Sequence, residues 1–174
     1  HLLFHLEHLP KCGADKFGES DRLTSGKVAF ILTLLSLRSS LIKNLNKMKK
    51  VIDGVCIQDN RILLVKKKDT WILPGGKIEV SEEKNDCLKR EFKEELPNIE
   101  ISIKEFYKSF DGITPFSRSE VFVDVFFIEI IGDDISTSRE ILDSKFFKKE
   151  ELMNLKISDI TREILNNLEK DGYL

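Results

Sequence analysis

The residues over 82–96 are predicted to form a helix with an apolar face. Leu88, Phe92 and Leu96 recur at helical spacing, so one apolar stripe can pack against a neighbouring layer. The ends of the segment carry a capping serine and a helix-stopping proline, Ser81 and Pro97. Such a helix predicts a globular domain with its core on one side of this segment.

The same helix carries a second stripe, which is made of acids. Glu91, Glu94 and Glu95 share one face, because residues three and four positions apart are neighbours on a helix. Three carboxylates on one face repel each other, and neither Lys89 nor Lys93 is spaced to pair within the trio. One interpretation is a solvent-exposed acidic face. The other is a site for a hard divalent cation such as Mg²⁺, which takes oxygen ligands.

The loop before the helix favours the cation site. Pro74-Gly75-Gly76 lets the backbone turn sharply and approach a ligand closely, because glycine has no side chain. A backbone carbonyl of this turn can add a metal ligand to those on the helix. A glycine turn that leads directly into an acidic helix is therefore a stronger indication than either feature alone.

The spacing of these residues resembles the Nudix box of the Nudix hydrolases: Gly76, five residues, Glu82, seven residues, and then Arg90-Glu91-Phe92-Lys93-Glu94-Glu95. The lead-in over 71–75 is also similar to that family. The box covers residues 76–98, and the resemblance begins near Met48. It departs from the usual pattern at its end, where a glycine and an aliphatic residue are replaced by Pro97 and Asn98. This change leaves the metal-binding face intact, and it leaves undetermined at which residue the next strand begins.

The resemblance implies a role for each acid of the box. The metal ligands would be the Gly75 carbonyl and the carboxylates of Glu91, Glu94 and Glu95, with Mg²⁺ as the cofactor and Mn²⁺ as the alternative. Glu94 would be either a third carboxylate ligand or the base that activates water. Three residues would support the site without binding the metal, namely Gly76, Glu82 and Arg90.

The catalytic base can also lie outside the box. The resemblance places such a base in a loop or strand near the C-terminal end of the sheet, where Glu140 and Asp143 precede Phe146-Phe147. Glu120, at the start of a predicted strand, is a further candidate. Helical geometry favours Glu94 as the base, and Glu140 stays the alternative.

A nine-residue loop is predicted over 111–119, between two long strands. Phe116 can stack on a nucleotide base, and Arg118 can contact a phosphate. The alternative is an exposed hairpin loop with Phe116 packed against the core.

The remaining pattern predicts an order of strands and helices. These segments are 51–57, 61–65, 71–73, 99–110 and 121–131 for strands, and 148–155 and 158–168 for closing helices. Asp59-Asn60 is a predicted turn that joins the first two strands in a hairpin. The strand over 121–131 is nearly continuous in Val, Phe and Ile, so both of its faces should be covered. The resemblance implies an α/β fold, the Nudix-type α/β/α sandwich with a mixed β-sheet. The box helix would lie on one side of the sheet and the C-terminal helices on the other.

Residues 1–47 are predicted to be a partly helical N-terminal extension to a Nudix hydrolase domain over 48–174. Their helical stripe consists of Ile31, Leu34, Leu41 and Leu45, and it continues to Met48. The longest apolar run, over 28–37, is about half as long as the roughly 20 residues that a membrane span needs. We therefore expect no membrane partner.

Cysteine content and charge bear on compartment and partners. The chain has three cysteines, far apart and without a C-x-x-C pair, which indicates reduced thiols and a cytoplasmic protein. A formal charge of −2 supplies no strong field for nucleic acid, so a nucleic-acid partner is not expected. The expected partner is a small-molecule nucleotide, and a homodimer stays open.

The function implied by the resemblance is Mg²⁺-dependent pyrophosphohydrolysis. The substrate would be a nucleoside diphosphate derivative or a nucleoside triphosphate, cleaved at a diphosphate linkage. The alternative is a catalytically silent nucleotide-sensing module, although such modules typically lack box carboxylates that are all present here. A related isomerase chemistry would need metal-binding histidines, and no histidine follows His8.

Overall fold

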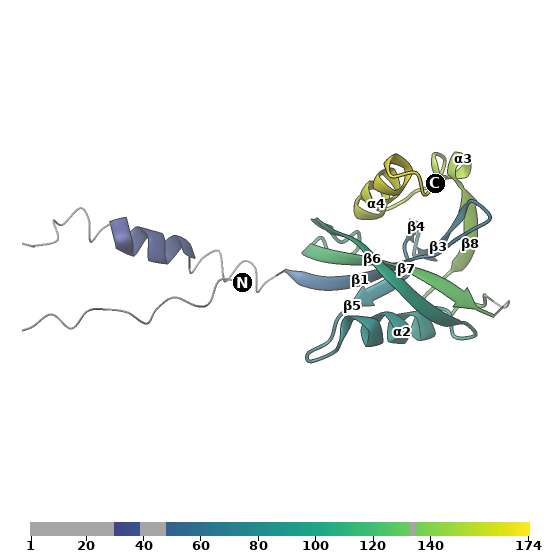
Figure 1. Cartoon of the computed structure of the whole chain (residues 1–174), viewed down its shortest axis with the longest axis horizontal. Coiled ribbons are helices and arrows are strands. Elements are labelled where there is room, and N and C mark those ends of the chain that lie inside the picture. Colours follow the sequence, from purple (N-terminus) through teal and green to yellow (C-terminus); the bar gives the residue numbers. More distant parts are fainter. Residues whose placement is uncertain (1–29, 39–47, 133–134) are drawn as a thin grey trace, which may run out of the picture. The chain divides into compact units, whose positions relative to one another are not determined.

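The computed structural model describes residues 30–38, 48–132 and 135–174. Residues 30–38 form a helix with exposed side chains, and Leu41 and Leu45 of the predicted stripe lie outside the described residues. None of the helices in the described ranges has the length and hydropathy that a membrane span requires. Figure 1 shows the other elements, which are β1 (Lys49–Val55), β2 (Ile57–Gln58), β3 (Arg61–Lys67), β4 (Thr70–Ile72), β5 (Gly75–Lys77), α2 (Lys84–Glu95), β6 (Glu100–Ile113), β7 (Glu120–Ile131), β8 (Asp143–Lys148), α3 (Lys149–Leu152) and α4 (Asp159–Lys170).

Four strands form the first sheet, in the order β5-β1-β7-β6. β1 runs parallel to β7, whereas β5 pairs with β1 and β6 pairs with β7 in antiparallel orientation. This arrangement confirms the predicted mixed sheet. Its register places Asp53 of β1 between Gly75 of β5 and Val125 of β7. The glycine turn predicted before the helix is thus part of a short edge strand, β5.

A second four-stranded sheet joins β2, β3 and β4, with β8 also paired to β3. The predicted hairpin is confirmed at β2 and β3, where Ile57 pairs with Ile62. Its two turn residues, Asp59 and Asn60, have positive φ angles of 51° and 56°. Two successive left-handed residues match the twist of the flanking strands, which explains the tight connection.

Helices cover both faces of the first sheet, as Figure 1 shows, which confirms the α/β/α sandwich. One hydrophobic cluster contains the apolar stripe of α2, with Leu88, Phe92 and Leu96 all buried. The other cluster contains α4. The predicted covering of β7 on both faces is confirmed, because Val125 belongs to the α4 cluster and Ile128 to the α2 cluster.

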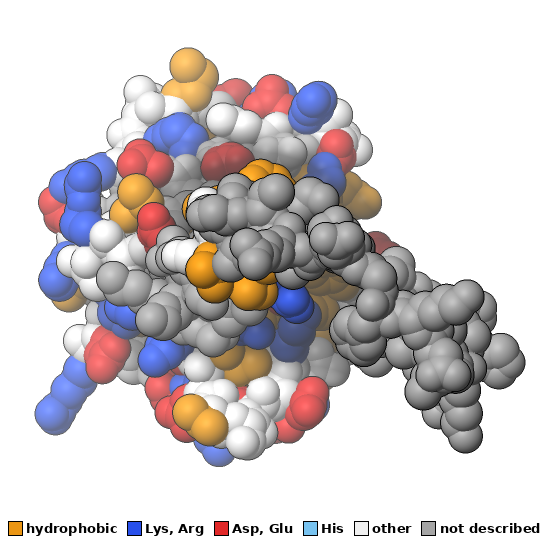
Figure 2. Space-filling view, turned by 90° about the vertical axis from the view of Figure 1, so that its left-hand side faces the viewer, with side chains coloured by type: hydrophobic (Ala, Val, Ile, Leu, Met, Phe, Trp, Pro, Cys, Tyr) orange, Lys and Arg blue, Asp and Glu red, His pale blue; other side chains and the backbone are white. Residues whose placement is uncertain are grey.

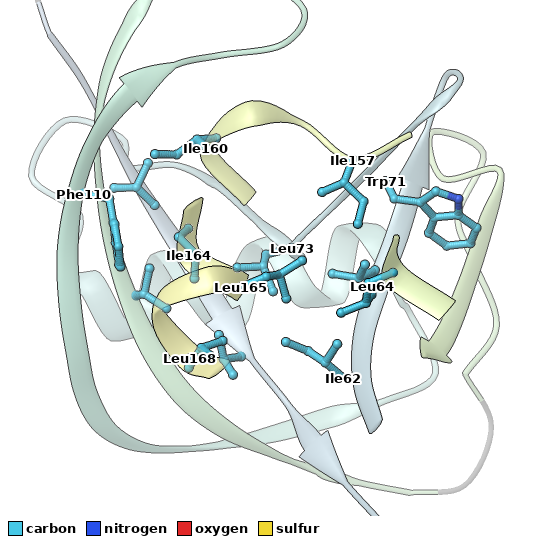
Figure 3. Close-up of a cluster of buried hydrophobic side chains, with 14 of the residues drawn as sticks. Ile62, Leu64, Trp71, Leu73, Phe110, Ile157, Ile160, Ile164, Leu165 and Leu168 are labelled. Carbon is cyan, nitrogen blue, oxygen red and sulfur yellow. The ribbon is translucent and has the colours of Figure 1, made fainter. Parts of the chain in front are cut away.

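Figure 3 shows the α4 cluster, in which Leu73 and Ile164 lie among the labelled core residues. Trp71 belongs to the same cluster and is 8% exposed. Its ring meets the Phe147 ring edge-on, with centroids 4.7 Å apart. Trp71 therefore anchors the strand that leads into the glycine turn, and packing in the core accounts for its position.

Ser81 does not cap α2, contrary to the prediction. The N-cap residue is Glu83, and its side chain forms no capping hydrogen bond. Ser81 instead has a φ angle of 66°, which bends the chain before the helix. The physical reason lies in Glu82, which stays outside the helix because its carboxylate is paired with Arg90.

Two further boundaries differ from the prediction. The loop predicted over 111–119 spans only 114–119, because β6 continues to Ile113 and pairs it with Glu120. The helix predicted over 148–155 is only the four-residue α3, because Asn154 and Leu155 donate to carbonyls three residues back in tighter turns. The last helix is confirmed as α4, capped by Ser158.

Candidate active site

Arg90 links the three parts of the site: the loop before α2, strand β5 and the acidic face of α2. Its guanidinium donates to both oxygens of Glu82, from Nε at 2.8 Å and from Nη2 at 3.0 Å. Nη2 also donates to the Lys77 carbonyl at 3.1 Å, and Nη1 donates to Glu91 at 2.7 Å. Hydrogen bonding from Arg90 lowers the pKa of Glu82 to about 2. The structure thus joins two of the predicted supporting residues, Glu82 and Arg90, in a paired contact.

Glu91 lies against β5, which contains Gly75 and Gly76 and is called the glycine strand below. A Cβ atom added to Gly76 would stand 2.2 Å from the Glu91 carboxylate, so only glycine leaves room for that carboxylate in its present position. Burial raises the pKa of Glu91, and Arg90 partly opposes this shift. Gly76 therefore shapes the space in which Glu91 stands, in keeping with its predicted supporting role.

Glu95 is the most buried acid of α2, with only 4% of the residue exposed. Its Oε2 accepts a hydrogen bond from the Gly75 N–H at 3.1 Å. Burial raises the pKa of Glu95 to about 8, although the Gly75 N–H and Lys67 both favour its charged form. A buried carboxylate with so few donors has unused capacity for a cation.

Glu94 lies at the open side of this group. Its side chain is 62% exposed, and its carboxylate accepts a hydrogen bond from Arg90 Nη1 at 3.4 Å. Glu94 therefore shares the Arg90 guanidinium with Glu91 and faces solvent. This position suits either of its predicted roles, as a ligand at the rim or as a base.

Asp53 is an acid of the site that the sequence interpretation missed. It lies on β1, directly across from Gly75, and is 8% exposed. Burial raises its pKa well above the ordinary value, and the charges of Glu95 and Glu91 raise it further. Asp53 therefore lies within electrostatic reach of both predicted ligands, although it is about 40 residues distant from them in sequence, well beyond the reach of local patterns.

The chain segment before β8 brings Glu140 to the same group. The Ser138 N–H donates to the Glu95 backbone carbonyl at 2.9 Å, which fixes this segment to the end of α2. Glu140 forms an ion pair with Lys67 of β3 at 3.1 Å. Glu140 raises the pKa of Glu95, and Lys67 lowers it. Lys67 was not predicted from the sequence, because one lysine in the run Lys66-Lys67-Lys68 carries no distinguishing pattern.

The other two candidate bases, Glu120 and Asp143, lie at the starts of two strands. Glu120 is exposed at the start of β7, five residues from Val125, the partner of Asp53. That separation corresponds to about 16 Å along a strand. Asp143 is exposed at the start of β8, where it accepts a hydrogen bond from the Ser144 N–H. Asp143 pairs with Lys66 of β3, and no hydrogen bond or ion pair among the described residues joins it or Glu120 to the acids around the glycine strand.

The loop over 114–119 carries the two predicted substrate contacts. Phe116 is partly exposed, and Lys68 Nζ lies 5.2 Å from its ring centroid. Arg118 has a φ angle of 52°, and its N–H donates to the Thr114 carbonyl. The Lys68 contact places this loop beside the β3–β4 turn, one residue from the Lys67 that faces the acids.

The donors fit a hard divalent cation by their chemistry. Glu91 and Glu95 supply carboxylate oxygens beside the backbone of the glycine strand, and burial disfavours their charged forms unless a cation compensates them. Among the described residues, no three acidic, histidine or cysteine side chains already stand in an arrangement that holds a metal ion. Glu91 is engaged by Arg90, and Glu95 by the Gly75 N–H, so these carboxylates must turn toward a cation.

The surface outside the acidic group offers less chemistry. A pocket between α3 and α4 is lined by residues that include Lys149, Met153, Arg162 and Leu174, and by none of the acids above. Figure 2 shows basic and acidic side chains intermixed on the face in view, where the described residues are not covered. Neither feature resembles a surface for a nucleic-acid backbone.

Comparisons with known proteins agree with this geometry. The family model described as the NUDIX domain matches residues 48–168. An ADP-ribose pyrophosphatase from Methanocaldococcus jannaschii is 31% identical over 149 residues, covering 75% of this chain and 85% of that protein.

Solved structures show the same fold. A NUDIX hydrolase from Nitrosomonas europaea aligns with a TM-score of 0.63 at 15% identity, over 72% of this chain and 90% of that chain. The MutT protein from Methanosarcina mazei aligns with a TM-score of 0.63 at 16% identity, over 72% of this chain and 95% of that chain.

Proposed function

We propose that this chain, which belongs to the NUDIX family and is a hydrolase of phosphoric anhydride bonds, cleaves ADP-ribose with the help of Mg²⁺. Water adds to one phosphorus of the diphosphate, and the bond from that phosphorus to the bridging oxygen breaks. The products are AMP and ribose 5-phosphate. The relationship to an ADP-ribose pyrophosphatase supports this substrate within the wider class of nucleoside diphosphate derivatives and nucleoside triphosphates.

The observation that carries the proposal is the buried carboxylate of Glu95 beside the glycine strand. Glu95 is 4% exposed, and within the described part of the chain its carboxylate accepts one hydrogen bond, from the Gly75 N–H. A cation held by Glu95, Glu91 and the Gly75 carbonyl, with Glu94 at the rim, would compensate a carboxylate in this position. Mg²⁺, or Mn²⁺ in its place, would neutralise the diphosphate and lower the pKa of a bound water.

The chain's own residues hold the site in shape. Arg90 joins Glu82, Glu91 and the Lys77 carbonyl, so it fixes α2 against β5 and the loop between them. Without that connection, the carboxylates of α2 and the backbone of β5 would not face the same cation. We assign Gly76, Glu82 and Arg90 to this supporting role.

A carboxylate must accept the proton of the attacking water. Glu140 is supported in this role by its place beside Glu95, next to Lys67. Glu94 is supported by its exposure on the face of α2. In either case the base lies at the mouth of the acidic group, where water has access. Phe116 and Arg118 are proposed to contact the nucleotide from the loop over 114–119.

We further propose that residues 48–174 form the catalytic domain and that the enzyme works in the cytoplasm. Both cysteines in the described part of the chain, Cys56 and Cys87, are free and buried, which suits a reducing compartment. A homodimer stays a prediction, and sedimentation of the purified protein measures its oligomeric state.

The test is hydrolysis of a panel of nucleotides by the purified protein. ADP-ribose, nucleotide sugars, dinucleoside polyphosphates and nucleoside triphosphates are each supplied with Mg²⁺, with Mn²⁺ or with a chelator. We expect equal amounts of AMP and ribose 5-phosphate from ADP-ribose, and none with the chelator. Preferred cleavage of another member of the panel would rule out ADP-ribose as the main substrate, but it would leave the proposed hydrolysis of a diphosphate linkage unchanged. Undiminished cleavage in chelator would reject the metal.

A further inference from the structure

Asp53 is the buried acid of the site that has no partner. Among the described residues its carboxylate makes no hydrogen bond and no ion pair, the residue is 8% exposed, and its oxygens keep only a narrow contact with solvent. Its neighbours on the same face of β1 are Val51 and Val55, which belong to the apolar α4 cluster. An acid in such surroundings is costly to bury unless something else compensates it.

The glycine strand lies between Asp53 and the acids of α2. It has no side chains at Gly75 and Gly76 that would shield these carboxylates from one another. A Cβ atom added to Gly75 would stand 2.8 Å from Asp53 Oδ1, and one added to Gly76 would stand 2.2 Å from the Glu91 carboxylate. The Gly75 N–H itself donates to Glu95. The carboxylates of Asp53, Glu91 and Glu95 therefore all lie next to the two glycines of β5.

We propose that Asp53 is a further carboxylate of the cation site. Its carboxylate would contact the divalent cation through a metal-bound water. This inference rests on the proposed function, because it assumes a cation at Glu91 and Glu95. A water-mediated contact suits the geometry, since Mg²⁺ keeps several of its waters and the acids are not arranged for joint direct ligation. The carboxylate of Asp53 then orients that water and adds negative charge to the site.

The test measures metal affinity directly, by electron paramagnetic resonance of free Mn²⁺ in a titration of the full chain. Asp53→Asn keeps the shape of the side chain and removes its charge. We expect Mn²⁺ to bind about 10- to 100-fold more weakly, the usual loss when an outer partner of a metal ligand is removed. The melting temperature in chelator should stay the same or rise, because an uncompensated buried acid is gone.

Asp124 supplies a matched control. It is a buried aspartate on the neighbouring strand β7, opposite Ile52, but it is fully partnered by Lys84 at 2.7 Å and by the Ser109 hydroxyl. Asp124→Asn should lower the melting temperature in chelator and leave Mn²⁺ affinity unchanged. The opposite pattern in the two variants separates a cation-binding acid from a structural one.

The remaining outcomes also decide the matter. Unchanged Mn²⁺ affinity in Asp53→Asn overturns the inference. Failure of both Asp53→Asn and Asp53→Ser to fold in chelator also overturns it, because an acid that serves the cation is dispensable in the metal-free fold. If Glu95→Gln binds Mn²⁺ as tightly as the wild-type chain, the proposed function itself fails, and that result is distinct from a failure at Asp53 alone.

Discussion

The carboxylate of Glu91 lies directly over Gly76, and a Cβ atom on Gly76 would come within 2.2 Å of it. These two residues are fifteen positions apart in sequence, one in a strand and one in a helix. Their contact explains why the turn before α2 needs a residue without a side chain. It also fixes where the first acid of α2 stands relative to the backbone of β5.

Gly76→Ala should therefore impair the site more than the fold. The added methyl group meets only the end of a flexible side chain, so Glu91 can move away from it at little cost in stability. We expect at least about a tenfold higher Mg²⁺ requirement in an activity titration, as for other changes that reposition a metal ligand. The melting temperature should change little.

Gly75→Ala is the matched control for that prediction. Here a Cβ atom would stand 2.2 Å from the Ile52 backbone carbonyl, and the φ angle of 144° is unfavourable for alanine. We expect a loss of about 1–3 kcal/mol of unfolding free energy, measured by urea denaturation. If Gly76→Ala lost as much stability as Gly75→Ala, the distinction between a methyl group that meets the Glu91 carboxylate and one that meets the β1 backbone would be wrong.

Arg90→Lys should not be tolerated, although it keeps the charge. A single ammonium group cannot reach Glu82, Glu91 and the Lys77 carbonyl at once, as the guanidinium does. We expect a lower melting temperature and at least about a tenfold loss of kcat/KM. Arg61→Lys is the control, because the Arg61 side chain pairs with just the exposed Asp59 among the described residues, so its replacement should change neither quantity. Equal effects of both substitutions would contradict the linking role of Arg90.

Glu95 predicts how metal-free stability depends on pH. Burial raises its pKa to about 8 from an ordinary value of 4.5, so the folded chain retains a proton between these pH values that the unfolded chain has released. The free energy of unfolding in chelator should therefore fall as pH rises from about 4.5 to 8. Glu95→Gln should flatten that fall and leave stability near pH 8 the same or higher. Stability that rises over this range, unchanged in the variant, would contradict the assignment.

The two candidate bases are separated by rate and metal dependence. If Glu140 accepts the proton, Glu140→Gln should lower kcat by about 10²- to 10⁴-fold with little change in the Mg²⁺ requirement. Glu94→Gln should then have a mild effect. If Glu94 is the base, the two results should be exchanged. Small, equal effects in both variants would contradict both assignments.

Local patterns predicted much of this molecule. The apolar stripe of Leu88, Phe92 and Leu96 and the acids beside it follow from helical periodicity, which depends only on neighbours along the chain. The hairpin at Asp59-Asn60 follows from turn chemistry of the same local kind. For these elements the sequence and the structure agree, because the interactions that form them lie within one or two turns.

The errors and omissions involve contacts between distant segments. Ser81 seemed to be a cap because the pairing of Glu82 with Arg90, which displaces the helix start, could not be seen locally. Asp53 is recognisable as part of the site only once β1 is known to pair with Gly75. Lys67 likewise gains meaning only from its ion pair with Glu140, a contact set by tertiary packing.

The role of the Glu95 carboxylate is tested by an Mg²⁺ titration of ADP-ribose hydrolysis, with the wild-type chain and Glu95→Gln measured side by side. We expect AMP and ribose 5-phosphate from the wild-type chain, at a rate that rises with Mg²⁺ and saturates. In the variant we expect no measurable turnover at any Mg²⁺ concentration. The variant should remain folded, as its melting temperature in chelator will show. Near-normal, Mg²⁺-dependent turnover by a folded Glu95→Gln protein would contradict the assignment of the buried carboxylate as the centre of the active site.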